Sequence, residues 1–257
     1  MNNQLKVTDS QVSDSAWKGL YYAGGAAAVA MVVLFRRFFA TELITFRGFG
    51  IFDVPDTMPI SAIGWFLLLQ KNRLLGLVLF DLVDLINYVL LGVSFLALYG
   101  ALRETNKGTM IAATAFGFVG IAVYGASNQA YSMLSLSNSY AAAQTEAEQA
   151  MFLAAGEALL AIHNPGKLQQ GTGIYVSFFL VLLAGLLISI VMLRSTRFNK
   201  ATAYAGIAAN LFALGYFPAL AVGSDIVWVF PTVSAPFRMV WYVLIAIGFF
   251  RLAANIK

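Results

Sequence analysis

The residues best suited to chemistry in this chain are two carboxylates inside an apolar segment. Asp81 and Asp84 lie in the stretch FDLVDLINYVLLG (Phe80–Gly92), and Tyr88 follows one helical turn later. Because the aspartates are three residues apart, they project from one face of a helix. Two neighbouring carboxylates in a site of low dielectric constant cannot both ionise cheaply. Such a pair is suited to proton coupling, to binding an amine or another cation, or to acid–base chemistry.

Polar side chains from other helices are expected at the same depth as these aspartates. The functional interpretation is a polar pocket that opens outward and binds a small amphipathic or cationic ligand. Arg238 could instead neutralise one aspartate and leave a static pair. The pocket is predicted to be lined by Asp81, Asp84, Tyr88, Tyr124, Asn128, Tyr131 and Arg238.

A purely structural interpretation explains the same residues. The apolar segment Leu74–Leu102 would be about 43 Å long as a helix, whereas the hydrocarbon core of a bilayer is only about 30 Å thick. Asp81 would then lie at the headgroup boundary, and Asp84 one turn inside. Arg238 could extend to the interface, and the tyrosines could form an aromatic belt. Both interpretations stay open, and Asp84 is the stronger candidate of the two aspartates.

Other kinds of chemistry find little support in the sequence. The chain has no cysteine and a single histidine, His163, so a multi-histidine metal centre or haem site is not expected, and we predict no metal and no cofactor. His163 precedes Asn164-Pro165-Gly166 and is expected to help end its helix. Glu157 lies six residues before His163 and points elsewhere on a helix. Glu146 and Glu148 are expected on a solvated helix face.

The composition places the chain in the membrane. Of its 257 residues, 60% are hydrophobic and only 11% are charged, whereas soluble domains have about 25% charged residues. The long apolar runs favour helices over a β-barrel. We therefore predict an all-α, polytopic transmembrane bundle in contact with a lipid bilayer. The net charge of +4 is modest and is interpreted as topology information, with no nucleic-acid partner expected.

The apolar runs predict one transmembrane domain over residues 17–257, after a polar tail at residues 1–16. The close packing of the first span is expected at Gly24 and Ala28. The last span is expected to begin at Pro236 with Ser234 as its cap. The predicted spans are Gly19–Phe35, Leu74–Leu102, Thr109–Tyr131, Gly173–Leu193, Ala201–Val222 and Pro236–Ala254.

Two connections on one face are expected to hold helices that do not cross the membrane. The first is Ile60–Gln70, which is too short to span. The second lies within Tyr140–Asn164, and a seventh span arises only if Met151–His163 crosses the bilayer. Basic residues favour the face with short turns as cytoplasmic. We predict a plasma-membrane protein with both termini in the cytoplasm.

Three stretches carry a resemblance to a known family. They are ALYGALRETNKG (Ala97–Gly108), SLSNSYAAAQTEAEQAMFLAAGEALLA (Ser135–Ala161) and GTGIYVSFFLVLLAGLLISIVMLRS (Gly171–Ser195). Over roughly residues 74–250, the chain resembles the bacterial and archaeal membrane proteins grouped as domain of unknown function 4386. The resemblance implies a multi-pass protein with six or seven helices. It implies no activity and no functional residue.

Three hypotheses for function follow from the sequence. The first is binding or transport of a small ligand through the predicted pocket. The second is a structural or partner-binding membrane subunit. The third, ranked lower, is an intramembrane enzyme that uses Asp81 and Asp84 as an acid–base pair on a lipid-like substrate. No inverted repeat is visible, so a carrier would need a homo-oligomer to supply its second half.

Overall fold

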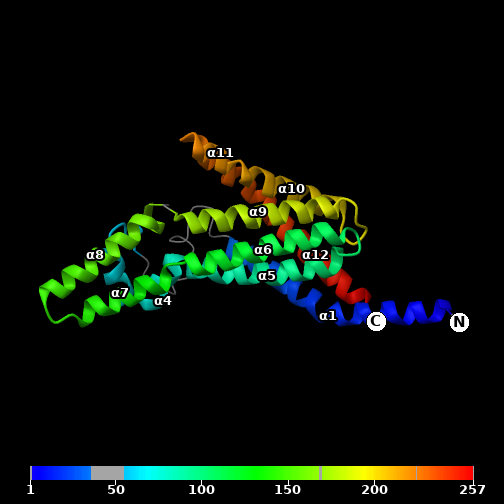
Figure 1. Cartoon of the computed structure of the whole chain (residues 1–257), viewed down its shortest axis with the longest axis horizontal. Coiled ribbons are helices and arrows are strands. Elements are labelled where there is room, and N and C mark those ends of the chain that lie inside the picture. The colour runs from blue at the N-terminus through cyan, green and yellow to red at the C-terminus, as the bar shows by residue number, and fades with distance from the viewer. Residues whose placement is uncertain (1, 36–54, 168–169, 224, 257) are drawn as a thin grey trace. The chain divides into compact units, whose positions relative to one another are not determined.

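The computed structural model describes residues 2–35, 55–167, 170–223 and 225–256. Every element in these ranges is a helix (Figure 1). Among the described residues, six stretches are long and apolar enough to cross a membrane, which confirms the all-α bundle and agrees with the six predicted spans. These stretches are Trp17–Leu34, Arg73–Leu102, Lys107–Ala142, Thr172–Met192, Lys200–Ala221 and Ile226–Asn255.

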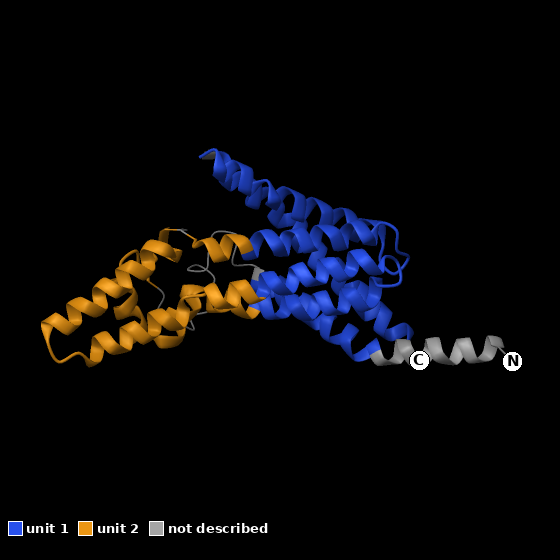
Figure 2. Ribbon diagram, in the orientation of Figure 1, with its two compact units in different colours: residues 1–35, 87–121, 177–257 blue, residues 36–86, 122–176 orange. Residues whose placement is uncertain are grey.

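The contacts within the chain define two compact units (Figure 2). Unit 1 comprises residues 1–35, 87–121 and 177–257, and unit 2 comprises residues 36–86 and 122–176. The assignment of residues 17–257 to a single domain stays a prediction. Residues 2–16, predicted as a polar tail, are part of the first helix, α1 (Asn2–Phe35).

Unit 1 is a helical bundle built around its last helix. That helix, α12 (Val229–Asn255), packs against both α10 (Lys200–Leu214) and α1. The hydrophobic core includes the buried rings of Phe95, Trp241 and Phe249. The unit also contains α11 (Tyr216–Ala221), the short η4 (Asp225–Trp228), and parts of α5 (Val83–Leu102), α6 (Lys107–Ser127) and α9 (Thr172–Met192).

Gly24 shows how closely the helices of unit 1 approach. A Cβ atom at this position would lie 2.5 Å from the Cβ of Ala97 in α5. Ala28, one turn further along α1, is fully buried. The predicted close packing at Gly24 and Ala28 is therefore confirmed, because a larger residue at position 24 would meet the side chains of Ala97 and Phe249.

The predicted start of the last span is wrong. Helix α12 begins at Val229, so Pro236 lies inside it and Ser234 is no N-cap. The Ser234 hydroxyl instead donates a hydrogen bond to the carbonyl oxygen of Ala209, at 2.7 Å. The hydroxyl therefore joins α12 to α10 and does not cap its own helix. The Ser–Ala–Pro sequence lies at a contact between these two helices.

Unit 2 contains the two elaborated connections. Its elements are α3 (Ala62–Lys71), α4 (Arg73–Leu77), the π-helical turn η2 (Val78–Leu82), α7 (Ala130–Ala142), α8 (Glu146–Ile162) and the short η3 (Pro165–Lys167). Helix α7 packs against α3 and α8. The non-spanning helix predicted at Ile60–Gln70 is present as α3. Helix α8 is not among the six candidate spans.

The end of the third predicted span differs from expectation. Tyr131 does not end the apolar helical stretch, because α7 continues it to Ala142 after a short break at Asn128-Gln129. Side chains of α7, including Met133, belong to the core of unit 2. Packing against α3 therefore stabilises a helix that its own moderate apolarity did not predict.

Side chains cap the two connecting helices of unit 2. Glu157, from α8, accepts a hydrogen bond from the backbone N–H of Ala62 at the start of α3, at 2.8 Å. Thr145 and Glu148 form a capping box at the start of α8. Hydrogen bonds from the backbone N–H groups of Gln144 and Thr145 lower the pKa of Glu148 below its ordinary value. Glu146 and Glu148 are exposed, as predicted.

Candidate functional site

The backbone of the second span is interrupted at Asp81. Phe80 has φ −95° and ψ 41°, and Asp81 has φ 70° and ψ 18°, so the helix is broken between α4 and α5. Asp81 is the one non-glycine residue with positive φ among the described residues. A left-handed conformation costs an ordinary residue about 1–2 kcal/mol, although aspartate and asparagine tolerate it best. Such strain persists where the surrounding structure holds it, often at functional sites.

The side chain of Asp81 is paired with the single histidine of the chain. His163 Nε2 lies 2.7 Å from Asp81 Oδ2, and the two residues are only 2% and 8% exposed. Both residues belong to unit 2. In a neutral imidazole, the Nε2–H group would donate to the carboxylate and leave Nδ1 as an acceptor. The pair is therefore a buried hydrogen bond with one ring nitrogen facing elsewhere.

The turn after α8 fixes the position of His163. The residue ends α8, as predicted, with its backbone N–H donating to the carbonyl of Leu159 at 3.0 Å. The next residue, Asn164, is buried and donates from Nδ2 to the carbonyl of Ile60 at 3.0 Å, while its Oδ1 accepts from the N–H of Gly166. A Cβ at Gly166 would lie 2.1 Å from the Pro59 carbonyl oxygen. The turn is thus held tightly against the entry to α3.

Asn128 connects a second break to the first. It lies between α6 and α7, where its Oδ1 accepts from the backbone N–H of Ala130. Its Nδ2 donates to the backbone carbonyl of Asp81 at 3.2 Å. A break in a helix frees backbone groups that must find other partners. Asn128 therefore satisfies groups from both interruptions and holds the Asp81 break against the start of α7.

Aromatic rings enclose the pair on one side. The Phe80 ring lies edge-on to His163, with 5.9 Å between centroids, and edge-on to Trp65, with 4.7 Å between centroids. Trp65 and Phe80 are fully buried. His163 Nδ1 and Trp65 Nε1 are buried and have no hydrogen-bond partner among the described residues. Buried polar atoms of this kind require a specific explanation, because most have partners.

The structure distributes the predicted pocket residues over both units. Asp81, Asp84, Tyr124, Asn128 and Tyr131 belong to unit 2, whereas Tyr88 and Arg238 belong to unit 1. The structure brings Asp81 and Asn128 together directly. The shared pocket of all seven residues stays a prediction.

The remaining pocket residues differ in their exposure. Asp84 is half-buried in the first turn of α5, Tyr124 is buried, and Tyr131 is 58% exposed. Tyr88 packs against the core of unit 1. Arg238 is half-buried, and one of its guanidinium nitrogens lies 3.5 Å from the Ala209 carbonyl oxygen.

Lipid geometry alone does not explain the surroundings of Asp81, whereas its position at the headgroup boundary stays a prediction. The side chain is enclosed by protein and paired with His163. Sequence reasoning favoured the role of ending its helix for His163 over a role in a site, and it did not pair His163 with Asp81. The available signal was that one histidine stands in a highly apolar chain. Its partner 82 residues away could not be found from spacing.

The Asp81–His163 pair can hold a proton or a small polar group. In the described ranges, no group of three or more His, Cys, Asp or Glu side chains could hold a metal ion. A carboxylate oriented against an imidazole is also the arrangement that positions a general base. Here no hydroxyl of a described residue is within hydrogen-bonding distance of His163 Nδ1.

Comparison with known families agrees with the helical pattern. The model of the family described as a domain of unknown function (DUF4386) matches residues 67–254. The chain belongs to this family. The match covers both Asp81 and His163, together with five of the six candidate spans. No curated protein and no solved structure matches the chain.

Proposed function

We propose that this membrane protein binds or transports a small cationic or amphipathic ligand at the Asp81–His163 pair. The observation that carries the proposal is the break at Asp81. At this break, the buried carboxylate of Asp81 contacts His163, the single histidine of the sequence, although Asp81 lies in the middle of an apolar stretch. Ionisable residues and broken helices within membrane segments are typical of ligand and ion sites.

The electrostatics favour a cation as the ligand. A bound ammonium or similar group could take the place of the imidazole as the partner of Asp81, since opposite charges attract strongly where water is excluded. Beside an aromatic wall, the buried Nδ1 of His163 could accept a hydrogen bond from the ligand, and the Nε1–H of Trp65 could donate one to an oxygen of an amphipathic ligand. Aromatic faces such as those of Trp65 and Phe80 also attract cations.

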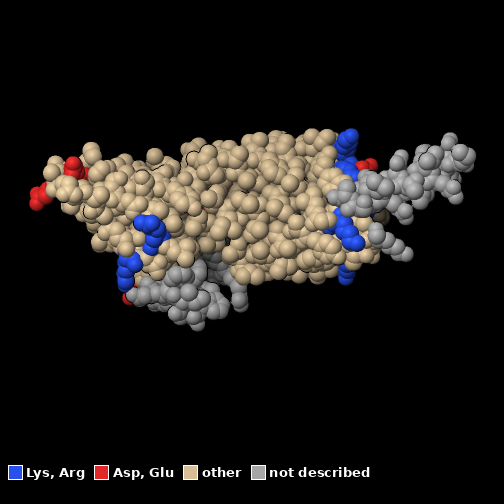
Figure 3. All heavy atoms as spheres, turned by 90° about the horizontal axis from the view of Figure 1, so that it is seen from below, with Lys and Arg blue, Asp and Glu red and all other residues tan. Residues whose placement is uncertain are grey.

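We also propose where the protein lies in the cell and how it is oriented in the membrane. The protein would lie in the plasma membrane of a bacterial cell with both termini in the cytoplasm. Basic residues of the short turns and adjoining helix ends support this orientation: Arg103, Lys107, Arg194, Arg197, Lys200 and Arg251. In Figure 3, one group of visible Lys and Arg side chains gathers at one end of the surface, beside a smaller acidic group, and a broad area without charged residues adjoins it.

Ligand-dependent thermal stability of the purified protein tests the proposal. Choline, spermidine and tetraphenylphosphonium are suitable probes, because they cover small, polyvalent and amphipathic cations. At least one should raise the melting temperature of the wild type, and Asp81→Asn should abolish that shift. Asp56→Asn is the matched control, because Asp56 is an exposed carboxylate of unit 2. Equal shifts in wild type and Asp81→Asn would overturn the proposal.

The same preparations separate the other two hypotheses. A stoichiometric partner that copurifies in mild detergent, without any ligand shift, would favour a structural subunit. Turnover of an added lipid pool, detected by mass spectrometry, would favour an intramembrane enzyme that uses the pair as a base.

A further inference from the structure

A cavity in unit 1 is independent of the Asp81–His163 site. It has a volume of about 100 Å³ and is lined by Arg197, Phe198, Asn199, Thr202, Leu244, Ile247, Gly248 and Arg251. The lining contains two arginines and no carboxylate. Its residues come from the turn between α9 and α10, from the first turn of α10 and from the last turns of α12.

The cavity lies at the ends of the candidate spans, and this position determines its depth in the bilayer. Arg251 lies close to the end of the span Ile226–Asn255, and Arg197 lies in the turn between the spans Thr172–Met192 and Lys200–Ala221. Both arginines are exposed. Residues at the ends of spans lie at the level of the lipid headgroups. We therefore expect the guanidinium groups at the depth of the phosphates of a bilayer.

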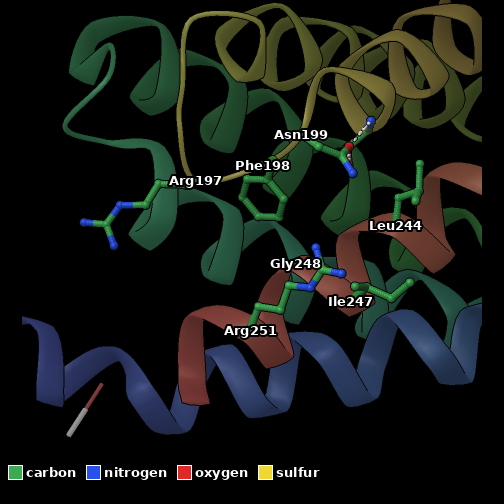
Figure 4. A pocket seen from close by; sticks show the side chains of 8 residues that line it. Arg197, Phe198, Asn199, Leu244, Ile247, Gly248 and Arg251 are labelled. Carbon is green, nitrogen blue, oxygen red and sulfur yellow. Dashed lines mark hydrogen bonds between the residues drawn. The ribbon is translucent and has the colours of Figure 1, made fainter. Parts of the chain in front are cut away.

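Phe198 gives the cavity a defined floor. It is 5% exposed and packs edge-on against Phe249, with 5.7 Å between ring centroids. A Cβ at Gly248 would lie 2.5 Å from its ring, so the glycine allows Phe198 to seat against α12. In Figure 4, Arg251 extends from α12 toward the turn, whereas Arg197 lies on the other side of Phe198 and points away from it.

Asn199 supplies a further donor. Its Oδ1 accepts from the N–H and the hydroxyl of Thr202, at 2.8 and 2.6 Å, as the cap of α10. This leaves the Nδ2 group to donate. The positive end of the α10 dipole lies at the same place. The ammonium group of Lys200 is already engaged, because it donates to the carbonyl oxygen of Leu193.

We propose that this cavity binds the phosphate of an anionic phospholipid headgroup, with Arg251 as the principal contact and Arg197 at the rim. Arginine is well suited to phosphate, because its planar guanidinium donates two parallel hydrogen bonds. Exposed apolar side chains of the adjoining spans, such as Ile247 at 42% exposure, would contact the acyl chains. A free phosphate ion shares the headgroup's charge and donors, but it would not use these apolar contacts.

Native mass spectrometry of the protein in a neutral detergent tests this site, because a neutral micelle has no anionic surface of its own. Added phosphatidylglycerol should remain bound to the wild type at molar excess, whereas phosphatidylcholine should not. Each of Arg251→Ala and Arg197→Ala should weaken retention, by about fivefold for one basic contact, with the larger loss for Arg251→Ala. Lys107→Ala removes the same charge from an exposed residue outside the lining of this cavity and should change nothing.

A second variant and a competition experiment complete the test. Gly248→Ala leaves the charge unchanged but displaces Phe198, so it should also lower retention. Inorganic phosphate at millimolar concentration should not displace the lipid; full displacement would overturn the lipid as the ligand and assign the site to free phosphate. Equal losses in Lys107→Ala and Arg251→Ala, or no loss in either, would overturn the site itself.

Discussion

Asp81 combines three properties that rarely occur together in one residue. It is buried, it has a left-handed backbone conformation, and its carboxylate contacts an imidazole. The backbone and the side chain can be tested separately, because glycine accepts positive φ without strain while alanine does not. Asparagine removes the charge and still tolerates this conformation.

We expect Asp81→Gly to be more stable than Asp81→Ala by about 1–2 kcal/mol, the energy of the left-handed conformation for a residue with a Cβ. Both variants lose the carboxylate, so that loss cancels in the comparison. Reversible unfolding in mixed micelles measures the difference. If Asp81→Ala were as stable as Asp81→Gly, the backbone at this position would not be left-handed.

The stability of the first turn of α8 in unit 2 is expected to depend on pH. Backbone hydrogen bonds lower the pKa of Glu148, so its carboxylate stabilises the start of α8 when the pH is above its ordinary pKa of about 4.3. That contribution falls as the pH drops through the lowered pKa. Hydrogen exchange of the first turn of α8 should therefore quicken on acidification, beyond the intrinsic effect of pH. Glu148→Gln should remove this dependence, and an unchanged dependence in that variant would contradict the capping role.

Close helix packing in unit 1 predicts a contrast between two glycines of α1. Gly24→Ala places a methyl group 2.5 Å from the Ala97 Cβ, whereas a Cβ at Gly19 has no atom within 4 Å. We expect Gly24→Ala to lower stability by about 1–3 kcal/mol, as overpacking does. Gly19→Ala should be neutral or slightly stabilising, because alanine favours a helix. Thermal unfolding of both variants checks this, and equal effects would argue against the α1–α5 contact.

The helices were predictable to different degrees, for physical reasons. Long apolar runs identify the spans because a bilayer demands them. Small residues such as Gly24 indicate close packing. Helix α7 was missed because its sequence, AYSMLSLSNSYAA, is only moderately apolar, and packing stabilises it. The break at Asp81 and its pairing with His163 depend on contacts between distant segments, for which periodicity holds no signal.

The six candidate spans of the described residues predict how the chain is arranged in the membrane. If all six candidate spans cross the bilayer, we expect both termini and the short turns on one side. Because the chain has no cysteine, a single introduced cysteine reports the side without background. With the proposed orientation, Thr196→Cys should react with an impermeant maleimide only from the cytoplasmic side, and Gln144→Cys only from the opposite side. Labelling of both from one side would contradict six crossings.

The central claim is that Asp81 and His163 form a buried pair at which a ligand binds. The chain has a single histidine, so protein labelled with ¹⁵N-histidine and reconstituted in nanodiscs has one imidazole to observe by NMR. The account predicts a protonated, hydrogen-bonded Nε2 that exchanges slowly with water. It also predicts that Asp81→Asn changes both ring-nitrogen signals, while Asp56→Asn leaves them unchanged. A rapidly exchanging imidazole with identical signals in wild type and Asp81→Asn would contradict it.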